Sequence, residues 1–221
     1  LHLSLRRQRQ MCIRDSKIAI GPGYTDGVIN LDASPAENII ALSKEKGVSP
    51  DQISACILDR SRHSKHIESV RSVGASVYLI QDGDVAGVIA TTNPNETNID
   101  IYMGIGGAPE GVLAAAALKC IGGQMQSRLV INNADEERRA KKMGIENLDK
   151  VYTLNELVSK DVIFSASGVT DGSMVKGVNF MDGKVSVETI VMRSTNGTIR
   201  YTVSYTHLRA HETRGNLVCR L

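Results

Sequence analysis

A glycine-rich turn joins a strand-like segment to an alanine-rich segment, and this junction limits the possible folds more than any other feature of the chain. Residues 99–105 are apolar and typical of a strand. They run into GIGGAPEG at Gly104 to Gly111, and residues 109–121 predict a helix that Gly122 and Gly123 end. A strand, a tight turn and a helix in this order are typical of an α/β sheet.

The same alternation occurs earlier in the chain, after a short alternating strand expected at Lys17 to Gly23. The residues from Ser34 to Glu37 form a capping box with Pro at the first helical position, which predicts a helix over 35–46 closed by Gly47. A strand, a helix and a second strand are then expected over residues 53–58, 64–73 and 76–81. This βαβ order implies a pair of parallel strands, and both strands are expected to be buried.

The last third of the chain has a different pattern. Residues 134–143 begin with acidic and end with basic side chains, which is typical of a solvated helix. Residues 162–167 are apolar and β-rich, and residues 178–202 predict three strands joined at the Asp182-Gly183 and Asn196-Gly197 turns. We therefore expect an α/β unit followed by an antiparallel meander.

Composition excludes several classes of protein. The chain has 221 residues, of which 42% are hydrophobic and 23% charged, and it contains no apolar run long enough to cross a bilayer. Aromatic residues make up 4% and Trp is absent, so the net charge of +2 does not indicate a nucleic-acid-binding protein. The four cysteines form no CxxC pair, and the first ten residues lack the apolar core of a signal peptide. We expect a cytoplasmic protein without a membrane or nucleic-acid partner.

The two ends are related to each other through the genetic code. Met11 to Asp15 can be written as codons whose reverse complement encodes Val-Ser-Tyr-Thr-His, which is the sequence of Val203 to His207. An inverted repeat of this kind resembles translated adapters joined to both ends of a DNA fragment. We therefore expect residues 1–16 and 203–221 to be adapter-like and residues 17–202 to be the native part, the alternative being two genuine basic tails.

Three loops carry residues suited to binding a phosphorylated ligand. The GIGGAPEG turn precedes a helix N-terminus, which favours phosphate, and Glu110 on its first turn either caps the helix dipole or binds a hard divalent cation. Asp82-Gly83-Asp84 follows a strand, where carboxylates bind sugar hydroxyls or a metal. Arg60-Ser61-Arg62 also follows a strand, and an Arg pair can hold phosphate oxygens. Each loop has a simpler explanation, as a packing turn, an Asp-Gly turn with an N-cap, or a solvated basic turn.

The remaining reactive side chains have structural explanations. His63 and His66 share no metal-ligand spacing with a third residue, so surface or hydrogen-bonded histidines are expected. Cys56 lies in an apolar strand and Cys120 in an apolar helix, where both are expected in the core.

All three loops follow strand ends of one predicted sheet, and their combination resembles the bacterial class II fructose-1,6-bisphosphatases. The resemblance covers essentially all of residues 17–200, and its motifs are KIAIGPG, ILDRSRH, QDGDVA, YMGIGGAPEG, KKMGIE, VIFSASGVTDG and VETIVMRS. It implies the C-terminal part of the sugar phosphatase fold shared with inositol monophosphatases, a mixed sheet with helices and the antiparallel meander.

The resemblance also implies an activity and a set of contacts. The activity is gluconeogenic hydrolysis of the 1-phosphate of fructose 1,6-bisphosphate with Mn²⁺ or Mg²⁺, in a full-length parent that forms a homo-oligomer. Glu110 corresponds to a metal ligand, and the substrate contacts correspond to Arg60, Ser61, Arg62, Asp82, Gly83, Asp84 and Gly107. The family often has Lys where Arg60 stands, which keeps the charge but changes its geometry.

The acidic half of the family's site has no counterpart in this sequence. In the family, the other metal ligands come before the segment that corresponds to Lys17 onward, and they include a DPIEGT-type loop. A substrate tyrosine also precedes that segment. The catalytic residues are therefore expected outside this chain, and the chain alone is expected to be inactive. The alternatives are a non-catalytic sugar-phosphate-binding module and a bifunctional enzyme that also hydrolyses sedoheptulose 1,7-bisphosphate.

Overall fold

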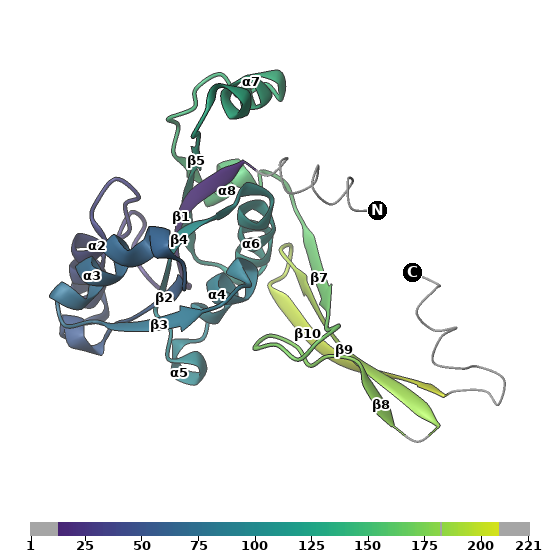
Figure 1. Cartoon of the computed structure of the whole chain (residues 1–221). Helices are drawn as coiled ribbons and strands as arrows, with labels where there is room; N and C mark the ends of the chain where they lie inside the picture. Colours follow the sequence, from purple (N-terminus) through teal and green to yellow (C-terminus); the bar gives the residue numbers. More distant parts are fainter. Residues whose placement is uncertain (1–12, 182, 208–221) are drawn as a thin grey trace.

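The computed structural model describes residues 13–181 and 183–207, which form two β-sheets and the helices around them (Figure 1). The strands of the larger sheet are β1 (Arg14–Ile20), β2 (Ser54–Leu58), β3 (Ser76–Ile80), β4 (Ile101–Gly107), β5 (Gln124–Val130) and β6 (Tyr152–Thr153). The smaller sheet contains β7 (Ile163–Ser167), β8 (Asn179–Met181), β9 (Lys184–Arg193) and β10 (Thr198–His207). The fold is therefore α/β with a mixed sheet, as expected.

The larger sheet brings the three candidate loops to one edge. Its strand order is β3-β2-β4-β1-β5-β6, in which β3, β2 and β4 are parallel. This confirms the predicted parallel pair. β1 runs antiparallel to both β4 and β5, and Arg14 at its start lies opposite Gly107 at the end of β4. The carboxyl ends of β2, β3 and β4 thus meet the amino end of β1.

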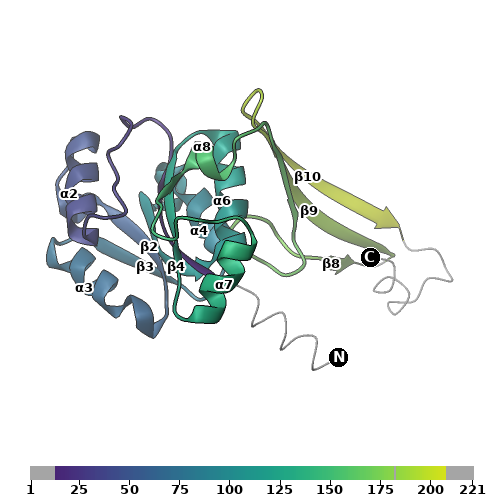
Figure 2. The same cartoon turned by 90° about the horizontal axis from the view of Figure 1, so that it is seen from above.

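Helices cover both faces of this sheet, and their bounds are α2 (Pro35–Lys46), α3 (Ser64–Ser72), α4 (Asp84–Ala90), α5 (Pro94–Thr97), α6 (Ala108–Ile121), α7 (Ala134–Lys142) and α8 (Leu154–Leu157). Figure 2 shows α2 and α3 on one face and α4 and α6 on the other. Alternate residues of β1 serve the two cores: Ile18 and Ile20 pack on the α2–α3 side, whereas Ala19 packs on the α4–α6 side.

Helix α6 lies between the two sheets. Ala114 and Ala115 pack against the larger sheet, while Ala117 and Cys120 pack against Phe164, Ile190 and Met192 of the smaller one. Small alanine side chains let both sheets approach the helix closely. The smaller sheet has the order β10-β9-β7, with β8 paired to β9, which confirms the predicted meander.

Several elements differ from the sequence expectations. β3 is an edge strand, not a buried one, and the exposed fractions of Tyr78 and Leu79 are 56% and 39%. β5 was not predicted because its sequence, QMQSRLV, is polar. The side chains of Gln124 and Gln126 accept hydrogen bonds from backbone N–H groups of the loop over residues 27–31. Polar residues are thus satisfied inside a sheet by a loop distant in sequence.

The sequence also made predictions about a surface helix and about the two chain ends. α7 is solvated as expected, with Ala140 as its buried residue and Lys141 Nζ 2.6 Å from a Glu137 carboxylate oxygen. β1 begins at Arg14 and β10 ends at His207, so both strands extend past the expected boundaries at 17 and 202. The rest of the expected tails, residues 1–12 and 208–221, lie outside the described residues. No helix in the described part has the length and apolar character needed to span a bilayer.

The capping box of α2 provides a test of local stability. The Ser34 side chain accepts from the Glu37 N–H, and the Glu37 carboxylate accepts from the Ser34 N–H at 2.7 Å. We expect Ser34→Ala to lower the free energy of unfolding by about 1 kcal/mol in a urea titration. Ser49→Ala is the matched control because Ser49 precedes a 3-10 helix without a side-chain cap, and an equal loss in both variants would contradict the assignment.

Candidate functional site

A pocket of about 400 Å³ lies at the edge where β2, β3 and β4 end. Its lining contains seven of the eight residues expected at the site. The lining residues are Arg14, Leu58, Arg60, Arg62, Asp82, Gly83, Asp84, Gly106, Gly107, Pro109 and Glu110. Ser61 is the exception: it is exposed at the start of a 3-10 helix over Ser61–His63 and does not line the pocket. Convergence of the three loops is thus a property of the fold.

Two arginines of the pocket, Arg60 and Arg62, are held by backbone carbonyl groups. Arg62 donates from Nε and from Nη2 to the Ile105 carbonyl oxygen, at 3.0 and 2.6 Å. Arg60 donates from Nη1 to the carbonyl oxygen of Asp59 at 2.7 Å and from Nη2 to that of Gln81. These bonds fix guanidinium positions before any ligand arrives, which lowers the entropic cost of binding an anion.

The charges of these arginines act on one another. Partial burial lowers the pKa of Arg62, and the neighbouring positive charges of Arg14 and Arg60 lower it further. Mutual repulsion of this kind means that an anion in the pocket relieves an unfavourable interaction. Arg14 also lines the pocket, and it was not expected there because it falls within the segment predicted to be adapter-like.

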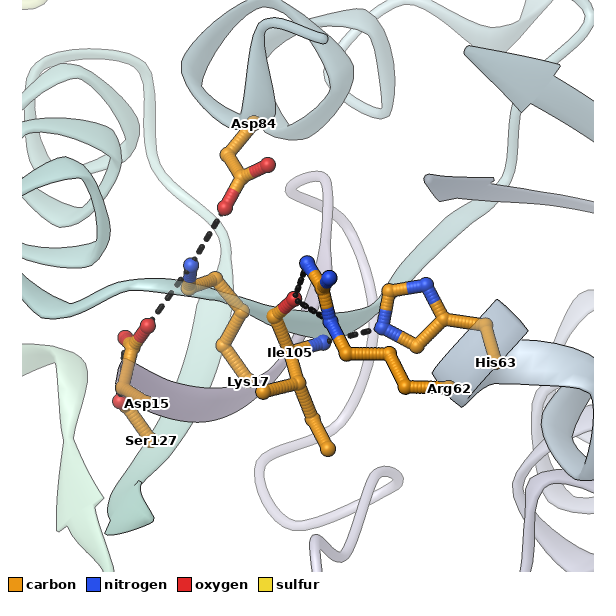
Figure 3. A network of polar contacts seen from close by, with 7 residues as sticks. All are labelled: Asp15, Lys17, Arg62, His63, Asp84, Ile105 and Ser127. Atoms are coloured by element: carbon orange, nitrogen blue, oxygen red, sulfur yellow. Dashed lines mark hydrogen bonds and ion pairs between the residues drawn. The ribbon is translucent and has the colours of Figure 1, made fainter. Parts of the chain in front are cut away.

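A buried ionic network holds Asp84, which lines the pocket (Figure 3). Lys17 Nζ lies 2.6 Å from Asp84 Oδ2 and 2.8 Å from Asp15 Oδ1. Ser127 Oγ donates to Asp15 Oδ2 at 2.8 Å. All three charged side chains are at most 3% exposed, and burial raises the pKa of Asp15 despite the nearby lysine. The network joins β1, β5 and the start of α4.

Two glycines of the GIGGAPEG motif make room for this network. A Cβ on Gly106 would lie 1.8 Å from Asp84 Oδ2, and a Cβ on Gly111 would lie 2.0 Å from Asp15 Oδ2. A Cβ on Gly107 would have Glu110 Oε2 as its nearest neighbour, at 3.3 Å, and the end of this side chain can move away. The motif therefore has the packing function that its simpler explanation suggested, but the sequence did not reveal the buried charged partners, which come from β1 and α4.

The N-terminus of α6 offers fewer hydrogen-bond donors than the motif suggested. The Ala108 N–H already donates to the Ile13 carbonyl oxygen at 3.0 Å, and Pro109 has no N–H. Of the N–H groups expected at this helix N-terminus, one is therefore in use and one is missing. An anion in the pocket therefore depends mainly on side-chain cations.

The Asp82-Gly83-Asp84 turn separates the roles of its two carboxylates. Gly83 adopts a left-handed conformation with φ of 86° and precedes α4 as its N-cap. Asp84 points inward to Lys17, whereas Asp82 is exposed at the pocket wall. The simpler interpretation, an Asp-Gly turn with an N-cap for a helix from Val85, is correct for the turn, but α4 begins at Asp84 and its N-cap Gly83 makes no side-chain bond. The buried Asp84 takes part in the ionic network instead.

Glu110 stands at the pocket on the exposed first turn of α6. Its carboxylate is suited to a hard cation such as Mg²⁺ or Mn²⁺. Among the described residues, however, no three His, Cys, Asp or Glu side chains are close enough together to hold a metal ion. The chain's described residues thus fit one ligand of such a site and not a complete one.

His63 is a satisfied core histidine, as the sequence suggested. Its Nε2 accepts from the Ile105 N–H at 2.8 Å, so Nδ1 carries the proton that is donated to the Leu58 carbonyl oxygen at 2.7 Å. Burial lowers the pKa of His63. The His66 ring lies edge-on to it at a centroid distance of 5.7 Å. Cys56 and Cys120 are buried free thiols, also as expected.

The packing of Gly106 predicts a position-specific loss of stability. Gly106→Ala places its Cβ against the Lys17–Asp84 pair, and separating that buried pair is expected to lower the free energy of unfolding by about 3 kcal/mol. Gly107→Ala is the matched control: Glu110 can move away, so the expected loss is less than about 1 kcal/mol. Urea unfolding measures both, and equal losses would contradict the packing assignment.

The raised pKa of Asp15 predicts the sign of a pH effect. The folded state keeps this proton at pH values where the unfolded chain has released it, so the stability contribution is complete below pH about 4 and is lost as the pH rises through the folded pKa. As the pH rises above about 4, the wild-type chain should therefore lose stability relative to Asp15→Asn. Unfolding free energies that follow parallel pH curves in the two proteins would exclude this mechanism.

Comparison with known proteins identifies the family of the chain. The family model described as bacterial fructose-1,6-bisphosphatase, glpX-encoded, matches residues 8–207. A protein of Synechococcus sp. (strain JA-3-3Ab), named D-fructose 1,6-bisphosphatase class 2/sedoheptulose 1,7-bisphosphatase, is 39% identical over 81% of this chain and 55% of its own length. A protein of the same name from Synechocystis sp. (strain ATCC 27184 / PCC 6803 / Kazusa) is 37% identical over 85% of this chain and 58% of its own.

The chain spans a little over half the length of these curated relatives, while the family match includes every strand and helix described above. The strand-end loops, the Gly-rich turn before α6 and the meander all lie within the matched residues. The chain therefore belongs to the bacterial fructose-1,6-bisphosphatase family encoded by glpX.

Proposed function

We propose that the chain carries the substrate-binding part of a metal-dependent fructose-1,6-bisphosphatase, which hydrolyses the 1-phosphate of fructose 1,6-bisphosphate to give fructose 6-phosphate. The observation that carries this proposal is the pocket in which Arg60, Arg62, Asp82 and Glu110 come together. The names of the family and of its relatives support the choice of substrate.

The chemistry of the pocket suggests a role for each group. Arg60 and Arg62 bind phosphate oxygens, since their guanidinium groups are charged and already oriented by backbone carbonyl groups. Asp82 accepts hydrogen bonds from sugar hydroxyls, and Asp84, held by Lys17, borders the same space. The backbone at Gly83 and Gly107 allows close approach of the sugar, with Ser61 as a contact from the rim.

Mn²⁺ or Mg²⁺ would polarise a phosphoryl oxygen and lower the pKa of the attacking water when bound. Glu110 is the proposed ligand from this chain. One carboxylate cannot hold the ion firmly, so the remaining ligands and the catalytic residues must come from outside the described residues. We therefore expect the purified 221-residue chain to bind the substrate without hydrolysing it.

Two other functions are compatible with the same pocket. Both relatives cited above carry sedoheptulose 1,7-bisphosphatase in their names, which favours a bifunctional enzyme as the second candidate. A non-catalytic sugar-phosphate-binding module would use the arginines but not Glu110. An in-frame DPIEGT-type segment encoded before Lys17 would favour the enzyme over the binding module.

The cellular setting is also a proposal. Two buried free thiols, Cys56 and Cys120, suit a reducing compartment, so we propose a cytoplasmic enzyme whose full-length form is a homo-oligomer, without nucleic-acid or membrane partners. Adapter origin of residues 1–16 and 203–221 remains a separate proposal. Nucleotide sequence across both ends would reveal the inverted repeat or its absence.

Binding of fructose 1,6-bisphosphate to the purified chain tests the proposed function. We expect calorimetry to detect binding that Arg62→Ala weakens about tenfold or more, because a charge-assisted hydrogen bond is lost. Arg71→Ala, an exposed arginine on α3, is the matched control and should bind as the wild type does. Absence of wild-type binding would contradict the substrate assignment.

A metal titration tests whether Glu110 acts as a metal ligand. Mn²⁺ should strengthen binding of the bisphosphate to the wild-type chain, and Glu110→Gln should remove this gain while keeping the metal-free affinity, since only the ligand carboxylate is lost. Metal-dependent release of phosphate by the purified chain would contradict the expectation that it does not hydrolyse its substrate. Sedoheptulose 1,7-bisphosphate in the same assay distinguishes the bifunctional candidate.

A further inference from the structure

The strands β2 and β4 separate as they approach the pocket. Their register pairs Ala55 with Ile101 and Cys56 with Tyr102, and the ladder ends there. β2 continues to Leu58 and β4 to Gly107 without pairing each other. Open α/β sheets bind ligands in crevices of this kind, at the carboxyl ends of diverging strands.

The imidazole of His63 fills the gap between the separated strands. Nδ1 donates to the Leu58 carbonyl oxygen at the end of β2, and Nε2 accepts from the Ile105 N–H of β4. One ring thus replaces the hydrogen bond that the two backbones would otherwise make directly. His63 is fully buried, so both of its ring nitrogens depend on these partners.

The surroundings of the ring are adapted to this position. A Cβ on Gly104 would lie 3.4 Å from His63 Cε1 and Nε2, at the close end of an ordinary van der Waals contact, so the first glycine of the GIGGAPEG motif lies directly beside the ring. The carbonyl oxygen of Ile105 is bound by Arg62, the residue before His63. Adjacent side chains therefore satisfy both backbone groups of Ile105, as Figure 3 shows.

We propose that His63 is a positioning residue, whose imidazole holds β2 and β4 apart at the spacing that sets Arg62 and the Gly106-Gly107 turn for anion binding. It acts through Ile105 and does not touch the ligand. The anion-binding part of this inference rests on the proposed function, whereas the spacing of the strands does not.

The protonation state of the ring is part of the geometry. Burial lowers the pKa of His63 most strongly, and Arg62 and His66 lower it further, while the Leu58 carbonyl and Asp84 act in the opposite direction. The phenol of Tyr102 approaches the same turn from β4. A second proton would sit on Nε2 and face the Ile105 N–H, so protonation removes the acceptor. Anion binding should therefore weaken at acid pH, and only below the ordinary histidine pKa of 6.5, because the pKa of His63 is lowered.

Three substitutions of His63 distinguish between the two hydrogen bonds of the ring. His63→Gln keeps an acceptor at the position of Nε2, His63→Asn keeps a donor at the position of Nδ1, and His63→Phe keeps the volume without either bond. We expect the Ile105 amide to exchange at least about tenfold faster in the Asn and Phe variants, because its acceptor is lost, and to remain largely protected in the Gln variant. His66→Asn is the matched control, with unchanged exchange at Ile105.

Titration with fructose 1,6-bisphosphate provides the second readout. Affinity should fall about tenfold in the Asn and Phe variants and recover in the Gln variant, whose binding should also lose the decline at low pH. Nitrogen NMR should find the Nδ1–H form of the wild-type ring. The opposite form of the ring, or unchanged Ile105 exchange in His63→Phe, overturns the proposal.

The two proposals fail in distinguishable ways. If the wild-type chain binds no bisphosphate but Ile105 loses protection in His63→Phe, the strand-spacing role is supported and the proposed substrate is wrong. If binding is normal in the Asn and Phe variants while Arg62→Ala weakens it, the substrate assignment stands and the positioning role is wrong. The Gln variant, which keeps the acceptor, covers the case in which the Phe variant does not fold.

Discussion

The ion pair between Lys17 and Asp84 is the interaction on which the pocket depends. Burying these charges is costly, and their separation of 2.6 Å compensates only while both partners stay in place. Lys17 lies on the central strand β1 and Asp84 on the first turn of α4, so the pair fixes that helix against the middle of the sheet. The position of Asp84 at the pocket depends on this pair.

The Gly-rich turn is best understood from the groups packed against it. Gly104 borders His63, Gly106 borders Asp84 and Gly111 borders Asp15. A phosphate-binding turn in its simplest form would present free N–H groups, yet Ala108 donates to Ile13 and Pro109 cannot donate. The glycines therefore admit buried polar side chains, and those side chains in turn arrange the cations that face the ligand.

Arg62 and His63 bind backbone groups that the separation of β2 and β4 leaves without partners. β2 and β4 separate after Cys56 and Tyr102, which leaves backbone groups that need partners. Ile105 receives them from His63 and Arg62, and the bond to its carbonyl oxygen also orients the Arg62 guanidinium. A requirement of folding, the pairing of buried backbone groups, thus prepares a cation for ligand binding.

The local elements and most of the residues that line the pocket could be predicted from the sequence. The Ser34 capping box, the parallel pair of β2 and β3, the meander and the three loops follow from short-range signals of capping, periodicity and turns. Tertiary structure decided the rest: the edge position of β3, the polar strand β5, the buried charge of Lys17 and the two bonds of His63. These depend on partners distant in sequence, such as Asp84 for Lys17 and Ile105 for His63, and pairwise burial of that kind leaves no local pattern.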